Sequence, residues 1–424
     1  MRYLPALLLP LLFLGCPPAP DTAAGPPVLP EEPFEYRAYP VENVQRPATY
    51  DLTQNHRSDP SFYVPDTTNE RYLPIRYLRV NFHVMNSRDT LYDFHGEKAE
   101  KFLKELVFYT NRVLKRTPQI FLTPEDTLVP ALPRRLLLNL AEDSTTASGY
   151  AIYEHYDDEL YWYLHDGKKR NRADLKVVKK YNVRPREELN IYVMGPPRES
   201  LEDPNFPRAS AVGIFLYEAI KVTGIMSTGR PPWDHAPNLT HEIAHALTLH
   251  HAWMRNDGCD DTPPHANNAW KAKESGPGLT SNNLMDYGPR QEALTPCQIG
   301  RMHSAMSRYG SVTRSWLNPY WCRYNRNEPV RVTKPLVWNG ARDFNTDIYV
   351  KRGGILTINN RVHLPDGATI HVDPGGVLNI GPEAVIHSDC GGTWKGIAVG
   401  VTASGLTGDV SISPEATFLN ERGR

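Results

Sequence analysis

The stretch 241-HEIAHALTLHH-251 holds four histidines and one glutamate within eleven residues. On a helix, His241 and His245 are one turn apart and share a face, so their two imidazoles can reach one metal ion. The opposite side of that helix carries an apolar stripe made of Leu239, Ile243, Ala246 and Leu247. The pattern predicts a helix that packs on a core behind and binds a metal in front.

Glu242 follows the first histidine and lies beside the metal-facing side of the helix. A carboxylate at that place can take a proton from a zinc-bound water and later return it to a leaving amine. A zinc hydrolase needs a third protein ligand besides His241 and His245. That ligand can come from a glutamate on a second helix or from a histidine further along the same segment.

Two short motifs follow downstream. Residues 281-SNNLMDYG-288 contain Met285 and, two residues later, Tyr287. Residues 295–298, Thr-Pro-Cys-Gln, form a capping box with proline at the first helical position. Apolar residues at helical spacing come next, so we predict a second helix here that ends near Gly310.

The order of these motifs resembles the pappalysin/cytophagalysin family of metzincin zinc metalloproteases. The HExxHxxxxxH segment is followed by 257-DGCDDTP-263, by 283-NLMDY-287 and by a Thr-Pro-x-Gln-x-x-Arg-Met sequence at 295–302. The resemblance covers about residues 75–320. It implies an α+β metzincin-like catalytic domain with a twisted mixed sheet, an active-site helix and a cleft.

The resemblance also implies the ligand set and the activity. In the extended pattern a histidine ten residues after the first is the third ligand, and here that residue is His251. We therefore expect one zinc ion on His241, His245 and His251, with His250 at the rim of the site. The expected activity is that of a zinc-dependent endopeptidase acting on a protein or peptide substrate.

Further roles are carried over in the same way. Glu242 is the expected general base, and Met285 lies in a tight turn beneath the metal. Tyr287 is expected as a catalytic residue that steadies the metal site or the oxyanion. Some members bind structural calcium near the Asp-Thr-Pro segment, and Asp257 and Asp261 match positions there, so the resemblance also implies these two residues as calcium ligands.

Two features depart from the family. Thr248 stands where the extended pattern has glycine, and a β-branched residue is poorly suited to a positive φ. Many members block the zinc with a pro-segment cysteine, but no cysteine lies between Cys16 and Cys259. The sequence leaves open how the chain turns between His245 and His251 and how a zymogen would be silenced.

The first residues, 1-MRYLPALLLPLLFLGC-16, indicate a signal peptide, since one arginine precedes an apolar run too short to cross a membrane. The small residue before Cys16 resembles a bacterial lipobox. It implies an exported protein held in the outer membrane or at the cell surface by a lipid anchor on Cys16. A plain secretory signal, giving a periplasmic or secreted protein, is the alternative. Proline-rich residues 17–71 are predicted to be an extended tether.

Charge and cysteine content narrow the partners. Lys and Arg (47) nearly balance Asp and Glu (48), so nothing indicates a nucleic-acid partner. Export permits disulfides, and the four cysteines after Cys16 allow three pairings. We expect Cys259 to pair with Cys297 because both flank the active-site region. The sequence does not indicate an oligomeric state.

Periodicity outlines the rest of the domain, which we place at residues 72–325. An alternating pattern predicts a strand at 75–85, and amphipathic spacing predicts a helix at 97–116. A buried strand is predicted at 189–195, with one or two more strands within 211–227. Residues 141–188 are polar and rich in tyrosine, and we expect an insertion of helices and loops there.

Residues 326–424 contain an internal repeat. The segment 347-DIYVKRGGILTI-358 aligns with 369-TIHVDPGGVLNI-380 at an offset of 22 residues, and 394-WKGIAV-399 resembles a further strand. A strand, glycine turn and strand of this length suit one coil of a parallel β-solenoid. We therefore predict a short β-solenoid-like all-β tail, with an ordinary pair of β-hairpins as the alternative.

A non-catalytic function is the competing hypothesis. In it the chain is a surface-anchored binding module on a degenerate protease scaffold, and the tail is the interaction surface. Thr248 and the short tail motivate this hypothesis, whereas the intact Glu242 argues against it. A zinc-loaded protein that is inert on a broad peptide library would favour it.

Overall fold

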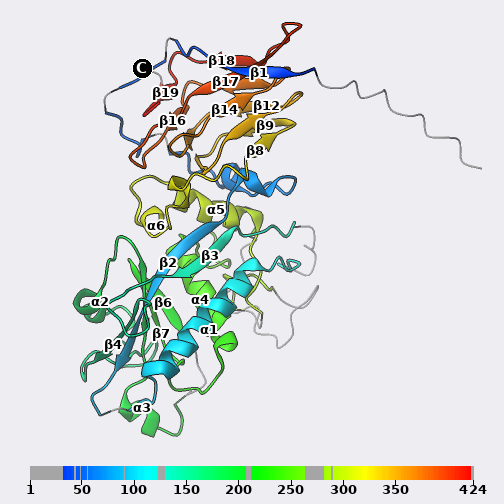
Figure 1. Ribbon diagram of the computed structural model, residues 1–424. Coiled ribbons are helices and arrows are strands. Elements are labelled where there is room, and N and C mark those ends of the chain that lie inside the picture. Colours follow the sequence, from blue (N-terminus) through cyan, green and yellow to red (C-terminus); the bar gives the residue numbers. More distant parts are fainter. Residues whose placement is uncertain are drawn as a thin grey trace, which may run out of the picture.

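The computed structural model describes residues 32–421 apart from 43, 48, 55, 90, 123–128, 207–211, 263–280 and 288–289. An α/β body and a C-terminal stack of short strands lie end to end (Figure 1). The predicted signal peptide, Cys16 and the first part of the predicted tether lie outside the described residues. Among the helices that are described, none combines the length and the apolar character that a bilayer span requires.

The body is built on a mixed sheet with the order β3-β2-β5-β7-β6, in which β4 also pairs with β2. The strands are β2 (Arg76–Asn86), β3 (Leu136–Leu140), β4 (Ile152–Tyr156), β5 (Leu189–Val193), β6 (Gly213–Leu216) and β7 (Ala219–Val222). Every pair is parallel except β6 with β7, so β6 is an antiparallel edge strand. The central β5 is buried throughout, as expected for a parallel strand covered on both faces.

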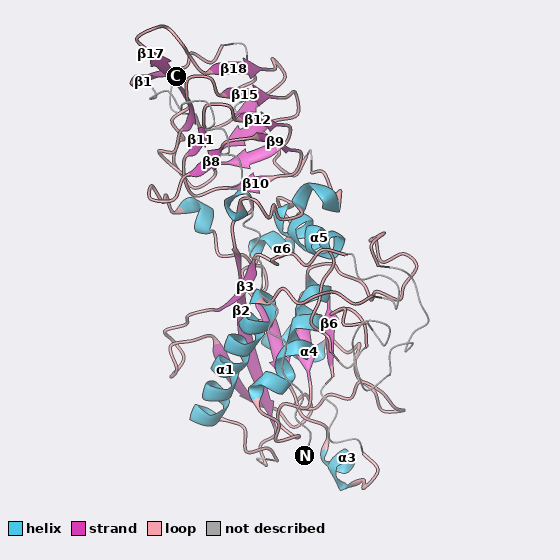
Figure 2. Ribbon diagram, turned by 90° about the vertical axis from the view of Figure 1, so that its right-hand side faces the viewer, coloured by secondary structure: helices cyan, strands magenta, loops and turns pink. Residues whose placement is uncertain are grey.

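Within the described part of the chain, six α-helices accompany these strands: α1 (Gly96–Lys115), α2 (Lys176–Tyr181), α3 (Arg198–Glu202), α4 (Pro232–Ala246), α5 (Pro296–Ser307) and α6 (Val312–Ser315). Helices α1 and α4 pack together and lie side by side on one face of the sheet, in front of its strands in Figure 2. Both bury leucines and other aliphatic side chains in one core with the sheet. The predicted capping box of α5 is present, since Thr295 and Gln298 each accept from the other's backbone N–H.

One part of the body differs from the sequence-based expectation. Residues 141–188 were expected to hold helices and loops only, and this is wrong for β4, which lies parallel to the second half of β2. The reason is that β4 is largely exposed: Ile152 is the one buried residue among its five. A strand with one buried side chain has no apolar alternation by which it could be recognised.

The C-terminal stack consists of three sheets whose strands from residues 330–418 are parallel, seen at the top of Figure 2. The first contains β8 (Val330–Val332), β11 (Ile348–Val350), β14 (Ile370–Val372) and β17 (Ile397–Thr402). The second contains β9 (Pro335–Trp338), β12 (Ile355–Ile358), β15 (Val377–Ile380) and β18 (Asp409–Ile412). The third contains β10 (Arg342–Asp343), β13 (Arg361–His363), β16 (Val385–His387) and β19 (Thr417–Phe418).

The chain visits these three sheets in the same order at each pass and adds one strand to each. Ile348 lies beside Ile370, and Leu356 beside Leu378, so the offset of 22 residues in the sequence repeat is the pairing register. Neighbouring strands of the repeat are parallel. The alternative of two ordinary hairpins is therefore wrong for these strands.

Much of the segment predicted to be an extended tether has a defined structure. Strand β1 (Phe34–Ala38) pairs antiparallel with β17 and covers its edge. Short 3-10 turns at Pro60–Tyr63 and Glu70–Tyr72 bury Tyr63 and Tyr72. The prediction of a tether up to residue 71 is wrong for these residues. The few aromatic side chains of this segment lie among many prolines, so its composition resembles that of an extended linker. Composition also does not show that the segment pairs with the open edge of a sheet elsewhere in the chain.

The body and the stack are joined by buried charges and by a disulfide. Asp343 accepts two hydrogen bonds from Arg314 at 2.7 and 3.0 Å and two from Arg361 at 2.6 and 3.4 Å, and all three side chains are almost fully buried. The disulfide Cys322–Cys390 bridges the same junction. The other disulfide is Cys259–Cys297, so the predicted pairing is confirmed.

Candidate metal centre

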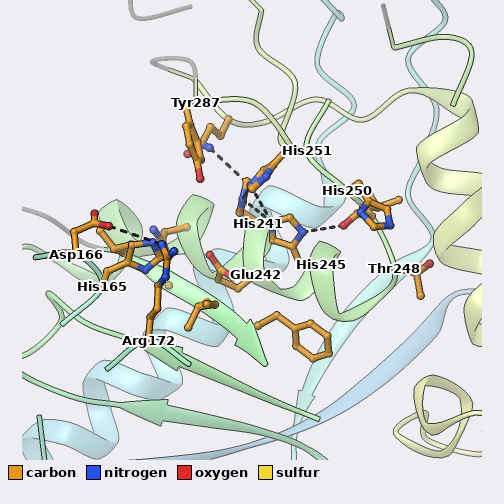
Figure 3. A pocket seen from close by; sticks show the side chains of 17 residues that line it. His165, Asp166, Arg172, His241, Glu242, His245, Thr248, His250, His251 and Tyr287 are labelled. Carbon is orange, nitrogen blue, oxygen red and sulfur yellow. Dashed lines mark hydrogen bonds and ion pairs between the residues drawn. The ribbon is translucent and has the colours of Figure 1, made fainter. Parts of the chain in front are cut away.

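Three histidines converge at the C-terminal end of α4 (Figure 3). The Nε2 atoms of His241 and His245 are 3.1 Å apart, and that of His251 lies 3.3 Å from the first and 3.1 Å from the second. In tetrahedral zinc sites with metal–nitrogen distances of about 2.0–2.1 Å, ligand nitrogens are about 3.3–3.4 Å apart. The three nitrogens therefore fit one tetrahedral metal ion, and His250 is not part of the group.

The far sides of two of these rings are held by backbone carbonyls. His241 donates its Nδ1–H to the carbonyl of Leu284 at 2.7 Å, and His245 donates its Nδ1–H to the carbonyl of Leu249 at 2.8 Å. A carbonyl can only accept, so each Nε2 is left with a free lone pair. Such outer contacts orient a histidine toward a metal and raise its basicity.

The histidines are also in the protonation state that binds metals. Burial lowers the pKa of His241 to about 3, and the neighbouring His245 adds to the effect. Burial likewise lowers the pKa of His251 to about 3 and lowers that of His245. All three imidazoles are therefore neutral at pH 7, as metal ligation requires.

Thr248 occupies the position that raised the main question from the sequence. Its φ is 75°, so the threonine adopts the left-handed conformation that glycine has in the extended pattern. The N–H of Leu249 donates to the carbonyl of Ala244 at 3.0 Å, and the N–H of Thr248 donates to the backbone carbonyl of His245 at 2.9 Å. These two bonds form a Schellman motif that ends α4, so the turn is made in the usual way but with an unfavourable residue.

Glu242 lies beside the three histidines and is only 5% exposed. Burial raises the pKa of its carboxyl to about 8, and a hydrogen bond from the backbone N–H of Phe215 acts in the opposite direction. Gly213 leaves the space for this side chain, because a Cβ there would stand 2.4 Å from Cγ of Glu242. Sequence reasoning missed Gly213, although a glycine inside a strand often marks a close approach.

The predicted methionine turn supports two of the histidines. Met285 is fully buried, and its carbonyl accepts from the N–H of Ala252 at 3.1 Å, next to His251. The preceding carbonyl, of Leu284, is the one that orients His241. Tyr287 is half-exposed at the rim, and its ring centroid is 5.2 Å from that of His251.

The two candidate calcium ligands are engaged as hydrogen-bond acceptors. Asp257 accepts from the N–H of Cys259 at 3.0 Å and from the hydroxyl of Thr262. Asp261 accepts from the hydroxyl of Thr295 at 2.7 Å and from the N–H of Cys297 at 2.9 Å. These contacts tie the loop to the start of α5, and they lend no support to a calcium site.

A cleft of about 790 Å³ opens in front of the histidines. Its wall includes the edge strand β6 and the polar side chains of His165, Asp166 and Arg172, labelled in Figure 3. The loop that bears these three is anchored by Lys221, a buried residue of β7. Its ammonium donates to the carbonyls of Asn171 at 2.9 Å and Asp174 at 2.8 Å. Burial lowers the pKa of Lys221 to about 8.

No sequence pattern indicated this wall of the cleft. The side chains of His165, Asp166 and Arg172 come from the polar stretch that was expected to be an insertion. Their position in the cleft depends on the pairing of Lys221 with carbonyls about 50 residues away. Backbone acceptors of this kind leave no trace in the side-chain pattern.

No family model matches the chain, and no curated protein matches it. Among solved structures, the chain is similar to that titled "Mirolysin in complex with compound 9", with a TM-score of 0.40 and 16% sequence identity. That alignment covers 57% of this chain and 96% of the other.

Proposed function

We propose that the chain is a zinc-dependent endopeptidase of the metzincin type, with zinc on His241, His245 and His251. The observation that carries the proposal is the triangle of Nε2 atoms with sides of 3.1–3.3 Å, next to the buried carboxylate of Glu242. The three nitrogens fit a zinc ion and leave its fourth position open toward the cleft.

Zinc, when bound, supplies a Lewis acid that lowers the pKa of a water to about 7 and polarises the scissile carbonyl. Glu242 is the group that accepts the proton of the attacking water and later delivers it to the leaving amine. Burial raises the affinity of this carboxyl for the proton, and the positive charge of a bound zinc would favour the ionised form, which is the form that accepts the proton. Tyr287, at the rim beside His251, is in a position to contact the substrate.

The edge of β6 supports a peptide as the substrate. The N–H of Thr223 donates to the carbonyl of Val212 at 2.9 Å, and antiparallel pairs alternate between bonded and unbonded residues. The backbone groups of Gly213 and Phe215 therefore point away from β7, on the side where the N–H of Phe215 donates to Glu242 and where both residues line the cleft. An extended peptide can add to such an edge as a further strand.

The remaining parts of the chain enter the proposal as follows. The stack is a short β-solenoid that follows the catalytic domain, with the domains at residues 72–325 and 326–424. The protein is exported, and Cys16 carries a lipid anchor in the outer membrane or at the cell surface. Two disulfides within the folded part are in keeping with an oxidising compartment.

The catalytic proposal is tested with Glu242→Gln. We expect the purified wild-type protein to hold about one zinc per chain and to cleave members of a broad peptide library. The variant should keep its zinc, measured by elemental analysis, because the carboxylate is not a ligand, and it should lose cleavage. Retained cleavage by the variant would refute the role of Glu242. A zinc-loaded wild type that cleaves nothing would favour the binding-module hypothesis.

The export proposal has an independent test. Bacteria that express the chain are labelled with a clickable fatty acid, and the wild type is compared with Cys16→Ser. We expect label on the wild type in the membrane fraction and none on the variant. A labelled variant, or an unlabelled wild type released to the medium, would contradict the lipid anchor.

A further inference from the structure

The positive φ of Thr248 is unfavourable for a threonine, so contacts from outside α4 are needed to stabilise this turn. Thr248 is the only β-branched residue with a positive φ among the described residues. A residue of this type is an outlier in the left-handed region and persists only where its surroundings hold it. The Schellman bonds from Thr248 and Leu249 are present, but a glycine would make the same bonds without strain.

The same turn determines the geometry of two of the three histidines. The carbonyl of Leu249, directly after Thr248, is the acceptor for Nδ1–H of His245 at 2.8 Å. His251 follows two residues later, and its Nε2 must reach within 3.1 Å of that of His245. A relaxation of φ at Thr248 would move both the acceptor of one ring and the backbone that carries the other.

Arg301 of α5 is the side chain that reaches this turn. Its Nη2 donates to the carbonyl of Thr248 at 3.2 Å, and its Nη1 donates to the carbonyl of Gly258 at 3.4 Å. One guanidinium thus links the chain before His251 to the loop after it. The planar fork of an arginine can hold two such acceptors in a fixed relation.

Gly258 gives an independent sign that this contact is built into the fold. Its φ is 85°, and a Cβ at this position would lie 1.9 Å from Nη1 of Arg301 and 2.7 Å from Cζ. Any larger residue would therefore displace the guanidinium. The absence of a side chain at residue 258 is what lets Arg301 pass.

The surrounding contacts fix α5 against the same loop. Cys297 lies one turn before Arg301 on the helix and forms the disulfide with Cys259. Asp261 accepts from the N–H of Cys297 and from the hydroxyl of Thr295. The start of α5 is thus anchored to residues 259–261, and Arg301 extends that anchorage to Thr248.

We propose that Arg301 is a positioning residue for the metal site: it holds the left-handed turn at Thr248 and through it the rings of His245 and His251. The inference rests on the proposed function, because it takes these histidines to be zinc ligands. Arg301 does not contact the reacting atoms. Its effect is on zinc affinity.

The test is a double-mutant cycle read as the dissociation constant for zinc, by competition with a chromophoric chelator. Arg301→Met, Thr248→Gly and the double variant are compared with wild type. We expect Arg301→Met to weaken zinc binding by roughly 10-fold, the lower end of the 10–100-fold lost when a direct outer contact of a ligand is removed, because Arg301 reaches the ligands only through Thr248. In the Thr248→Gly background the loss should be several-fold smaller, because glycine keeps a positive φ without support.

Two further variants keep the test decisive. Gly258→Ala retains Arg301 but obstructs it, so it should weaken zinc binding in the same direction even if Arg301→Met folds poorly. Arg308→Met replaces an exposed arginine at the end of α5 and should leave zinc affinity unchanged.

The outcomes separate the two proposals. Wild-type zinc affinity in both Arg301→Met and Gly258→Ala would overturn the positioning role of Arg301. Equal losses with threonine and with glycine at position 248 would overturn the path through the turn. A wild-type protein that binds no zinc would instead refute the proposed function itself.

Discussion

Gly213→Ala is the substitution that most directly tests how the general base is held. Gly213 begins β6, and an added Cβ would stand 2.4 Å from Cγ, 2.8 Å from Cδ and 2.9 Å from Oε1 of Glu242. Glu242 cannot yield easily, because it is 5% exposed and its carboxylate accepts from the N–H of Phe215. The methyl group must therefore displace the carboxylate from its place beside the three histidines.

The magnitude follows from the overlap. Carbon atoms in contact are separated by about 3.5–4.0 Å, so Glu242 has to move by about 1 Å. A misplacement of that size costs on the order of 100-fold in rate, which corresponds to about 2.7 kcal/mol in the activation free energy. Zinc content should not change, because the three atoms nearest the added methyl group all belong to Glu242, which is not a proposed zinc ligand.

The assay is kcat/KM on a cleaved library peptide, together with zinc content. Gly353→Ala is the control for an added methyl group without a clash, because a Cβ there meets nothing within 4 Å; its φ of 77° disfavours alanine, which is a strain that Gly213 does not have. It should lower stability without lowering the activity of the folded protein. A Gly213→Ala enzyme with full zinc and kcat/KM within a few-fold of wild type would refute the steric argument.

Three further outcomes are expected. Burial lowers the pKa of His83 in the folded state to about 3, below 6.5 in the unfolded chain, so its contribution to stability is present above pH 6.5 and is lost as the pH falls. When the pH is lowered from 7 to 5, the wild type should lose about 2 kcal/mol more of its free energy of unfolding, measured in urea, than the His83→Gln variant loses. Equal losses in the two proteins would contradict this. Asp343→Asn should lower the free energy of unfolding by roughly 3–5 kcal/mol in the same assay, because Arg314 and Arg361 would be left buried without their carboxylate. The control Asp409→Asn changes an exposed side chain and should leave the free energy of unfolding unchanged. Removal of zinc by a chelator should lower the melting temperature, because zinc at 1,000 times its dissociation constant stabilises the folded state by about 4 kcal/mol, and unchanged melting would contradict a metal bound to the native fold.

Local features of the fold were predictable because they are set by spacing along the chain. The 3.6-residue period identified α1 and the apolar side of α4, and the capping box located the start of α5. The offset of 22 residues between the two repeats is the register of the stack. The pairing of Cys259 with Cys297 followed from their nearness to one loop.

Features that depend on exposed or backbone groups were not predictable in this way. Strand β4 has one buried residue, so its membership in the sheet is decided by hydrogen bonds to β2 rather than by its own side chains. The edge of β17 is covered by β1 from more than 350 residues earlier, because an unpaired edge needs a partner and the nearest one in space is the N-terminal segment.

The candidate site likewise has features that were predictable from the sequence and features that were not. The sequence by itself determined which side chains can share one metal ion, because His241 and His245 are a helical turn apart and covalent spacing fixes their face. Only the tertiary structure decided how they are aimed, through the carbonyls of Leu284 and Leu249. It alone explained Thr248, since the left-handed turn is bonded to Arg301, 53 residues away. Side-chain identity is written in the sequence, whereas the backbone acceptors and empty spaces that orient a side chain exist only once distant segments have packed together.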